Sequence, residues 1–291
     1  MAKIHKYGVR DLERDFPSDE ACLNFIFEAL HSKKCSCGGT YKLIKGRKQY
    51  QCGSCRFQIA PTSGTIFQKS DTPLRLWFMA IYLFSNAKSG LSAKQLERDL
   101  NVTYKTAWRI LTLIRQSLKQ STEKLTGDIE MDETYLGGKG NAGHDNKNLS
   151  AVMRKKSVII GAKERHGILR AKVTPNAQAK TIGAFIDENL DITKTKRLIT
   201  DESNRYGRVA LGFDRHMVKH KIKEYVRGDI HVNSMEGFWG HVKRSVQGTH
   251  KVISRKYLPF YLDGFVFHYN NRRNDRERFS SLLGALLLAS K

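Results

Sequence analysis

The sequence lacks any run of about 18 apolar residues, the length that a membrane-spanning helix requires. Its first residues contain no apolar signal core, and no internal repeat or low-complexity segment follows. We therefore expect a cytoplasmic protein. Acidic residues are scarce relative to basic ones: 28 Asp and Glu against 51 Lys and Arg give a net charge of +23. Such an excess attracts polyanions. It therefore favours a nucleic-acid-binding protein, with a generic basic protein as the alternative.

The length of 291 residues suggests more than one domain. Composition predicts an N-terminal helix and cysteine-rich segment at 1–65, a helical region at 70–122, alternating strands and helices at 126–275, and a C-terminal tail at 276–291. Gly137, Gly138 and Gly140 predict a loop after the first strand of the third segment. The expected fold class is multidomain α/β.

Four of the five cysteines form two close pairs, Cys35 with Cys37 and Cys52 with Cys55, separated by a segment that predicts a hairpin. A reducing compartment favours metal ligands over disulfides, and four thiolates can hold a tetrahedral structural Zn²⁺. The pattern predicts a zinc ribbon, although its first pair is tighter than the usual C-x2-C. Scattered free thiols are the alternative, and Cys22 is expected to be a buried free thiol on a helix over 20–30.

Residues 70–122 have a helical period, with a buried helix expected over 74–85. Ser92 is expected to cap a helix that ends at Leu100, and Thr103 to cap a second helix over 104–120. This arrangement predicts a helix-turn-helix with Trp108 in its core. A plain helical hairpin is the alternative. The residues of the second helix expected to contact DNA are Tyr104, Lys105, Thr106 and Arg109.

Three parts of the third segment combine acidic residues with a clear strand or helix pattern. An alternating segment over 128–135 predicts a half-buried strand with Glu130 and Asp132 on one face. An apolar strand over 197–200 runs into Asp201, an acid that is costly to bury unless it binds something. A helix predicted from residue 234 carries Glu236 and Lys243 on one face. Carboxylates from two strands and a helix can hold two divalent metals on a scissile phosphate, whereas any one acid alone could be a solvated surface group.

Taken together, these segments resemble the DDE-type insertion-sequence transposases, in the subgroup with an N-terminal zinc ribbon ahead of an RNase H-like core. The resemblance extends over about residues 20–275, and its motifs agree in order and spacing. The matching segments are G-T-I-F at 64–67, G-L-S-A-K-Q-L at 90–96, Y-K-T-A-W at 104–108, M-D-E-T-Y-L-G-G at 131–138, T-D at 200–201, H-V-N-S-M-E at 231–236 and K-R at 243–244.

The resemblance implies that Asp132, Asp201 and Glu236 are a catalytic triad that binds two Mg²⁺ or Mn²⁺ ions, and that Lys243 contacts DNA near the cut. Relatives in this subgroup can carry Asn at the third position, which makes Asn233 the alternative third ligand. We favour Glu236 because a carboxylate binds a hard cation better than an amide does.

The function implied is metal-dependent DNA cleavage and strand transfer that move the insertion sequence encoding the protein. The expected partners are double-stranded DNA, both the terminal inverted repeats and the target, and further copies of the chain on DNA, with no membrane involved. The protein would be cytoplasmic and associated with the nucleoid. An RNase H-like nuclease or resolvase, and a noncatalytic zinc-ribbon DNA-binding regulator derived from a transposase, are the alternatives.

Residues near the acids have separate interpretations. Glu133 should point to the opposite strand face and be structural, while His231 is either a hydrogen-bonding site residue or a structural group before the helix. An apolar helix over 260–269 should pack on the sheet. Basic residues predict a DNA-binding track, with a solvated basic face as the alternative. They are Arg215, Lys219, Lys221, Lys223, Arg227, Lys243, Arg244, Lys251, Arg255, Lys256, Arg272 and Arg273.

Overall fold

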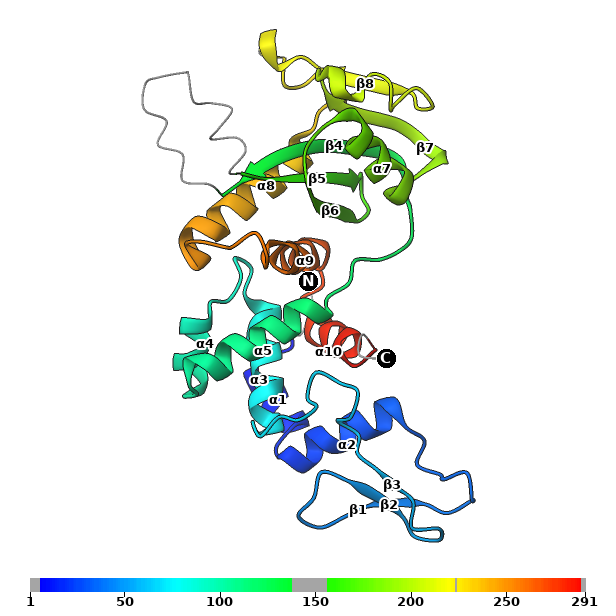
Figure 1. The fold of residues 1–291 in the computed structure, drawn as a ribbon, viewed down its shortest axis with the longest axis vertical. Coiled ribbons are helices and arrows are strands. Elements are labelled where there is room, and N and C mark those ends of the chain that lie inside the picture. The colour runs from blue at the N-terminus through cyan, green and yellow to red at the C-terminus, as the bar shows by residue number, and fades with distance from the viewer. Residues whose placement is uncertain (1–5, 138–155, 223, 289–291) are drawn as a thin grey trace, which may run out of the picture. The chain divides into compact units, whose positions relative to one another are not determined.

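The computed structural model describes residues 6–137, 156–222 and 224–288, and divides into two compact units (Figure 1). The first unit joins residues 1–119 to residues 271–291, and the second comprises residues 120–270. Gly138 and Gly140 of the predicted loop, and Lys223 of the predicted track, lie outside the described residues. None of the helices in these ranges is both long and apolar enough to cross a bilayer.

The first unit is mainly helical, and its helices share a core rich in aromatic rings. Tyr7 stacks on Phe279 with ring centroids 5.2 Å apart, and Phe16 packs edge-on against Phe78 at 4.7 Å. Residues 276–291, predicted only as a tail, thus contain a helix whose apolar side is buried in this core. The helices are α1 (Val9–Asp15), α2 (Asp19–Leu30), α3 (Leu74–Asn86), α4 (Ala93–Leu100), α5 (Tyr104–Ser117) and α10 (Arg278–Leu288).

The turn between α4 and α5 is built by its capping residues. Ser92 Oγ accepts a hydrogen bond from the Gln95 amide at 3.1 Å, and Thr103 Oγ1 accepts one from the Thr106 amide at 3.3 Å, so both predicted caps are confirmed. Asn101 ends α4 in the left-handed conformation, with φ of 50°. The prediction that Trp108 is a core residue is wrong, because 37% of its surface is exposed.

The cysteine pairs lie in a small antiparallel sheet of β1 (Tyr41–Leu43), β2 (Tyr50–Cys52) and β3 (Gln58–Ile59). The predicted hairpin is therefore confirmed, since β1 and β2 pair directly. Helix α2 covers this sheet through Phe27, whose ring stacks on Tyr50 at 4.0 Å. Cys22 on the same helix is fully buried, as predicted.

The second unit is a mixed five-stranded sheet in the order β6-β5-β4-β7-β8, which confirms the predicted mixed sheet. Strands β4, β5 and β6 pair antiparallel, whereas β7 runs parallel to both β4 and β8. The strands are β4 (Leu125–Leu136), β5 (Ser157–Glu164), β6 (Leu169–Thr174), β7 (Leu190–Asp201) and β8 (Arg215–Val218).

Successive residues of a strand point to opposite sides of the sheet. Both sides of this sheet carry apolar residues, and helices cover each side. Ile129, Met131 and Leu198 face helix α7 (Ala179–Asn189) and the short helix η2 (Asn204–Tyr206). Leu136 and Ile159 face α8 (Asn233–Ser245) and α9 (Leu258–Asn270), as predicted for the apolar helix over 260–269. The even-numbered residues of β4 therefore point toward α8. A short helix η3 (His220–Ile222) and a π-helical turn η4 (Val246–His250) complete the unit.

Candidate active site

Asp132 and Asp201 lie at the same level on neighbouring parallel strands. The last paired residues of β4 and β7 are Glu130 and Ile199, and each aspartate lies two residues further along its strand. Side chains two residues apart share a face. Glu130 contacts Ser234 of α8, and Ile199 packs against Val232 just before that helix. Both aspartates therefore belong to the α8 face of the sheet.

Helix α8 rests on this face through a tryptophan that binds the first aspartate. The Trp239 Nε1–H donates to Asp132 Oδ2 at 3.1 Å, and only 3% of the Trp239 surface is exposed. Gly161 on β5 pairs directly with Asp132. A Cβ atom at Gly161 would lie 2.8 Å from the Trp239 ring and 2.6 Å from Met235 Cε. The indole can reach Asp132 because position 161 has no side chain.

The electrostatic surroundings of Asp132 connect it to the other two predicted ligands. Burial raises the pKa of Asp132 to about 7, and the negative charges of Glu133, Asp201 and Glu236 act in the same direction. The hydrogen bond from the Glu133 amide to Asp132 Oδ1, at 2.9 Å, opposes this change only in part. Asp132 is thus a half-buried acid within electrostatic range of three further carboxylates, an arrangement that attracts cations.

The three predicted ligands are not drawn together as tightly as metal-bound groups would be. Within the described part of the chain, four cysteines are the only group of three or more His, Cys, Asp or Glu residues with potential ligand atoms all within 4.8 Å of one another. Asp201 Oδ1 accepts a hydrogen bond from the Ser203 amide at 3.0 Å. Glu236 is partly exposed, with Oε1 lying 3.7 Å from His220 Nε2.

The other predicted residues of α8 occupy its exposed side. Asn233 is the first residue of the helix, which begins one residue earlier than predicted, and its side chain is exposed. Lys243 and Arg244 are exposed in the last turn. The structure therefore presents Asn233, Glu236 and Lys243 to solvent along one helix.

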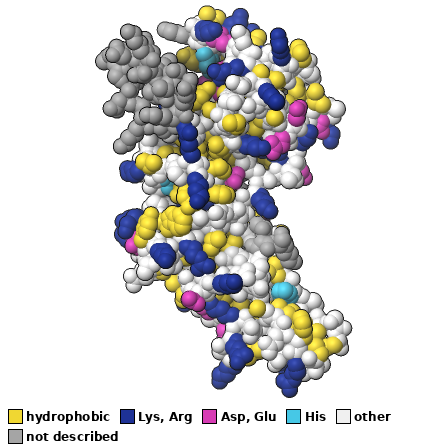
Figure 2. Space-filling view, viewed as in Figure 1, with side chains coloured by type: hydrophobic (Ala, Val, Ile, Leu, Met, Phe, Trp, Pro, Cys, Tyr) yellow, Lys and Arg dark blue, Asp and Glu magenta, His cyan; other side chains and the backbone are white. Residues whose placement is uncertain are grey.

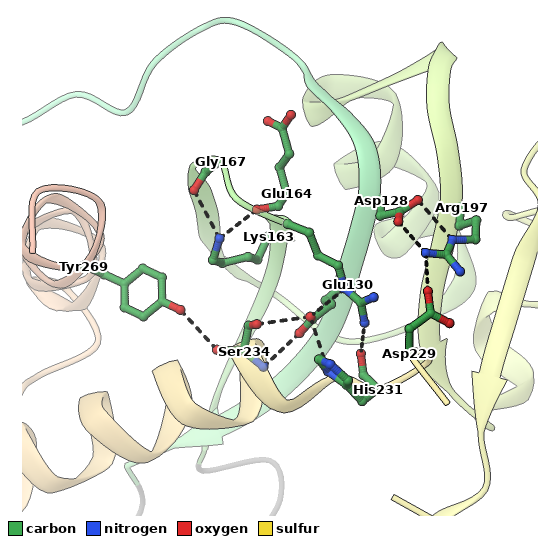
Figure 3. A network of polar contacts seen from close by, with 11 residues as sticks. Asp128, Glu130, Lys163, Glu164, Gly167, Arg197, Asp229, His231, Ser234 and Tyr269 are labelled. Carbon is green, nitrogen blue, oxygen red and sulfur yellow. Dashed lines mark hydrogen bonds and ion pairs between the residues drawn. The ribbon is translucent and has the colours of Figure 1, made fainter. Parts of the chain in front are cut away.

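Glu130, which the sequence indicates only as a neighbour of Asp132, fixes the start of α8 to the sheet (Figure 3). It is fully buried and accepts hydrogen bonds from the Ser234 amide at 2.8 Å, from Ser234 Oγ at 3.1 Å and from Arg165 Nε at 3.1 Å. A carboxylate at a helix N-terminus is also favoured by the helix dipole. His231 Nδ1 lies 3.5 Å from the same carboxylate, just before α8.

Tyr206, Arg205 and Arg215 support the ends of β4 and β7. The Tyr206 hydroxyl donates to Glu133 Oε2 at 2.5 Å and Arg205 Nη1 donates to Oε1 at 2.9 Å, so Glu133 faces away from Asp132, as predicted. Arg215 donates to Thr200 Oγ1 and to the carbonyl oxygens of Asp201 and Ser203. Its guanidinium holds the chain around Asp201, and its place in the DNA-binding track stays a prediction.

The four paired cysteines converge in the first unit. Sγ of Cys35 lies 3.6 Å from Sγ of Cys55, and Sγ of Cys37 lies 3.5 Å from Sγ of Cys52. This cluster is compatible with a structural Zn²⁺, because four sulfur ligands suit tetrahedral coordination. The Tyr41 hydroxyl donates to Cys35 Sγ at 3.3 Å and, with the Cys37 amide, lowers the pKa of Cys35 to about 6, which favours its thiolate form. Hydrogen bonds with the neighbouring thiols instead raise the pKa of Cys55 to about 12.

The residues predicted to contact DNA on α5 lie largely at the surface. Tyr104 is 45% exposed, Lys105 and Arg109 are exposed, and Thr106 is half-buried. The exposed Trp108 adds an aromatic ring to this helix. Lys and Arg side chains are spread over both units on the face shown in Figure 2. The surface can therefore attract a polyanion.

Comparison with known proteins identifies the second unit. The ISXO2-like transposase domain family matches residues 124–270, half of the chain. The chain belongs to this family. The matched segment coincides closely with the second compact unit, residues 120–270, so the ISXO2-like transposase domain is the mixed sheet with its helices.

The chain is also similar to an uncharacterised protein in the transposable element ISH50 of Halobacterium salinarum. The two are 28% identical over 244 residues, covering 78% of this chain and 79% of the relative. Among solved structures, the simian T-cell lymphotropic virus intasome in complex with the PP2A regulatory subunit B56 gamma aligns at 10% identity over 65% of this chain and 68% of that chain. The TM-score of 0.30 is too low to support an argument.

Proposed function

We propose that this chain is a DDE-type transposase, in which Asp132, Asp201 and Glu236 hold divalent metal ions for DNA cleavage and strand transfer. Family membership supports action on DNA during transposition. The observation that carries the catalytic assignment is the shared register of Asp132 and Asp201 beneath α8, together with the influence of both Asp201 and Glu236 on the pKa of Asp132.

The donor chemistry fits Mg²⁺ or Mn²⁺. Oxygen ligands suit these hard cations, and a half-buried aspartate among other acids gains free energy when a cation neutralises it. Bound metal would polarise the scissile phosphate and lower the pKa of the attacking hydroxyl. The chain's own groups position the ligands: the Trp239 indole orients Asp132, the Ser203 amide orients Asp201, and Glu130 fixes the start of the helix that carries Glu236.

The first unit is proposed to recognise DNA. Helices α4 and α5 would act as a helix-turn-helix that contacts the terminal inverted repeats through Tyr104, Lys105, Thr106 and Arg109, and Zn²⁺ on the four cysteines would stabilise a zinc ribbon. The second unit would be an RNase H-like catalytic domain, in which Lys243 and Arg244 contact DNA near the cut. Copies of the chain would assemble on paired element ends.

The catalytic assignment is tested with a duplex that carries the terminal repeat, read from the DNA flanking the gene. Asp132→Ala, Asp201→Ala and Glu236→Ala should each abolish Mg²⁺-dependent cleavage while leaving duplex binding nearly intact. The control is Glu188→Ala, which removes an exposed acid paired with Lys172 on the other side of the sheet. Asn233→Ala should be milder, because water can replace a neutral ligand.

The products separate the candidate activities. Joining of the cut end to target DNA supports a transposase, whereas hydrolysis without joining indicates a nuclease or resolvase. Binding without any cleavage by the wild-type chain indicates a noncatalytic regulator. Efficient cutting by Glu236→Ala, together with loss of cutting in Asn233→Ala, would show that Asn233 is the third ligand.

A further inference from the structure

The second unit contains a pocket of about 440 Å³ beside the proposed catalytic face. Its walls are the last residues of β4, the first residues of β5, and the chain that leaves α8 through η4 toward α9. This volume falls within the range of about 300–1,000 Å³ that is usual for small-ligand sites. The pocket is therefore large enough for more than a surface ion.

The charge of the pocket is uniform. Of the described residues that line it, every charged one is a cation: Lys156, Lys243, Lys251 and Arg255. Such a group of cations favours a phosphate-bearing ligand. The four cations by themselves would suit a phosphate of the DNA backbone at the mouth of the pocket.

The interior of the pocket requires a ligand with an apolar part. Leu136 and Leu258 are buried members of the hydrophobic cluster beneath α8 and α9, and Val246 and Ile253 pack against that cluster. All four line the pocket. A phosphate gains no favourable free energy from contact with an aliphatic surface. The flat face of a nucleobase does, because the contact removes apolar area from water.

The backbone on one side of the pocket is in an uncommon conformation. Helix α8 runs into the π-helical turn η4, and Lys251 follows with φ of 61° and ψ of −58°. The Val252 amide donates to the His250 carbonyl at 2.7 Å, which closes a γ-turn around Lys251. Both π-turns and strained γ-turns are rare and recur at functional sites. This conformation brings Lys251 to the wall of the pocket.

The pocket lies within reach of DNA held at the proposed metal site. Leu136 is four residues beyond Asp132 on β4, a distance of about 13 Å at 3.3 Å per residue. That distance corresponds to about four nucleotides of B-form DNA at 3.4 Å each. Lys243, two helical turns from Glu236, lines the pocket as well.

We infer that this pocket receives one unstacked nucleotide of the DNA strand, near the scissile phosphate, with its base on the aliphatic floor and its phosphate among the cations. The inference rests on the proposed function for the identity of the DNA. It adds to that function a site at which the duplex is locally opened.

The test uses the full chain and terminal-repeat duplexes with 2-aminopurine at successive positions around the cut, in EDTA so that the DNA stays intact. Binding should raise the fluorescence at one position within about four nucleotides of the cut, because an aliphatic floor does not quench an unstacked base. Lys251→Gly removes a cation at a backbone conformation that glycine adopts freely, and Ile253→Ser makes the floor polar. Each should reduce the occupancy of that position about tenfold.

Lys180→Ala is the control, since it removes an exposed cation from α7, on the other face of the sheet, that does not line the pocket. It should leave the fluorescence rise intact. A rise that neither pocket variant reduces would overturn the inference, as would cleavage in Mg²⁺ without a rise at any position. Free 2-aminopurine deoxyribonucleoside monophosphate that competes as well as the DNA would assign the pocket to a free nucleotide instead. A rise without cleavage would contradict the proposed function and leave the pocket assignment in place.

Discussion

Asp132→Asn should change how the stability of the second unit depends on pH. The pKa of Asp132 is about 7 in the folded protein, compared with 3.8 for an ordinary aspartate. Between these values the folded protein keeps a proton that the unfolded chain releases, so the free energy of unfolding falls as pH rises from about 4 toward 7. Asparagine does not titrate, so the free energy of unfolding of the variant should not fall in this way as pH rises.

The magnitude follows from the shift. Each pH unit between the two pKa values costs the wild type about 1.4 kcal/mol, so raising the pH from 5 to 7 should cost about 2–3 kcal/mol relative to the variant. At pH 5 the variant should be no more stable than the wild type. One amide oxygen cannot accept both the Glu133 amide and the Trp239 indole, and an unmet donor costs about 1–3 kcal/mol. The sign of the difference should therefore reverse as pH rises.

Thermal unfolding in EDTA from pH 5 to pH 8 measures this effect. The melting temperature of the variant relative to the wild type should rise by about 5–10 °C over that interval, since 1 kcal/mol corresponds to about 2–4 °C for a unit of this size. The control is Glu188→Gln, an exposed acid on α7. If Asp132→Asn and the wild type lose stability in parallel as pH rises, the electrostatic account of Asp132 is wrong.

Three further predictions concern other parts of the chain. Gly161→Ala should destabilise the second unit by about 1–3 kcal/mol through overpacking. Gly237→Ala should instead stabilise it by about 0.5–1 kcal/mol, because Gly237 has open space beside it on α8. Equal melting temperatures of the two variants would contradict the packing argument. Cys52→Ser should lose about one tightly bound zinc per chain in metal analysis, and Cys22→Ser should keep it. If Arg109 contacts a base, Arg109→Ala should weaken binding to terminal DNA by roughly 1–3 kcal/mol; if Arg109 contacts phosphate, the variant should bind all DNA sequences less well. Unchanged affinity would place the contact surface elsewhere.

Local patterns in the sequence predicted much of the sheet. The alternation over 128–135 assigned Asp132 and Glu133 to opposite strand faces, and their hydrogen-bond partners lie on opposite sides of the sheet. Caps at Ser92 and Thr103 were equally local. Such features depend on residues within one or two turns of each other, which a single sequence displays directly.

Contacts between distant segments could not be predicted in this way. Trp239, Asp132 and Gly161 meet only after three elements pack, and nothing local marks the glycine as the space that admits the indole. Helix α10 is stabilised by rings from the other end of the chain, such as Tyr7 on Phe279. Trp108 was misplaced because a helical period gives the direction of the apolar face but not its width.

Glu130 and Asp132 show how one strand face can separate structure from chemistry. Glu130 receives three hydrogen bonds, one of them from the Arg165 guanidinium, whereas Asp132 receives two and has three acids nearby. The same change of acid to amide should therefore have opposite effects at pH 8. Glu130→Gln should destabilise the second unit by about 3 kcal/mol, because it leaves the Arg165 charge partly buried without its counter-charge, and Asp132→Asn should stabilise it. Melting curves of both variants in EDTA, with Mg²⁺ added afterwards, test the distinction. Glu130→Gln should still gain stability from Mg²⁺, and Asp132→Asn should not; an equal gain in both variants would mean that Asp132 does not bind the cation.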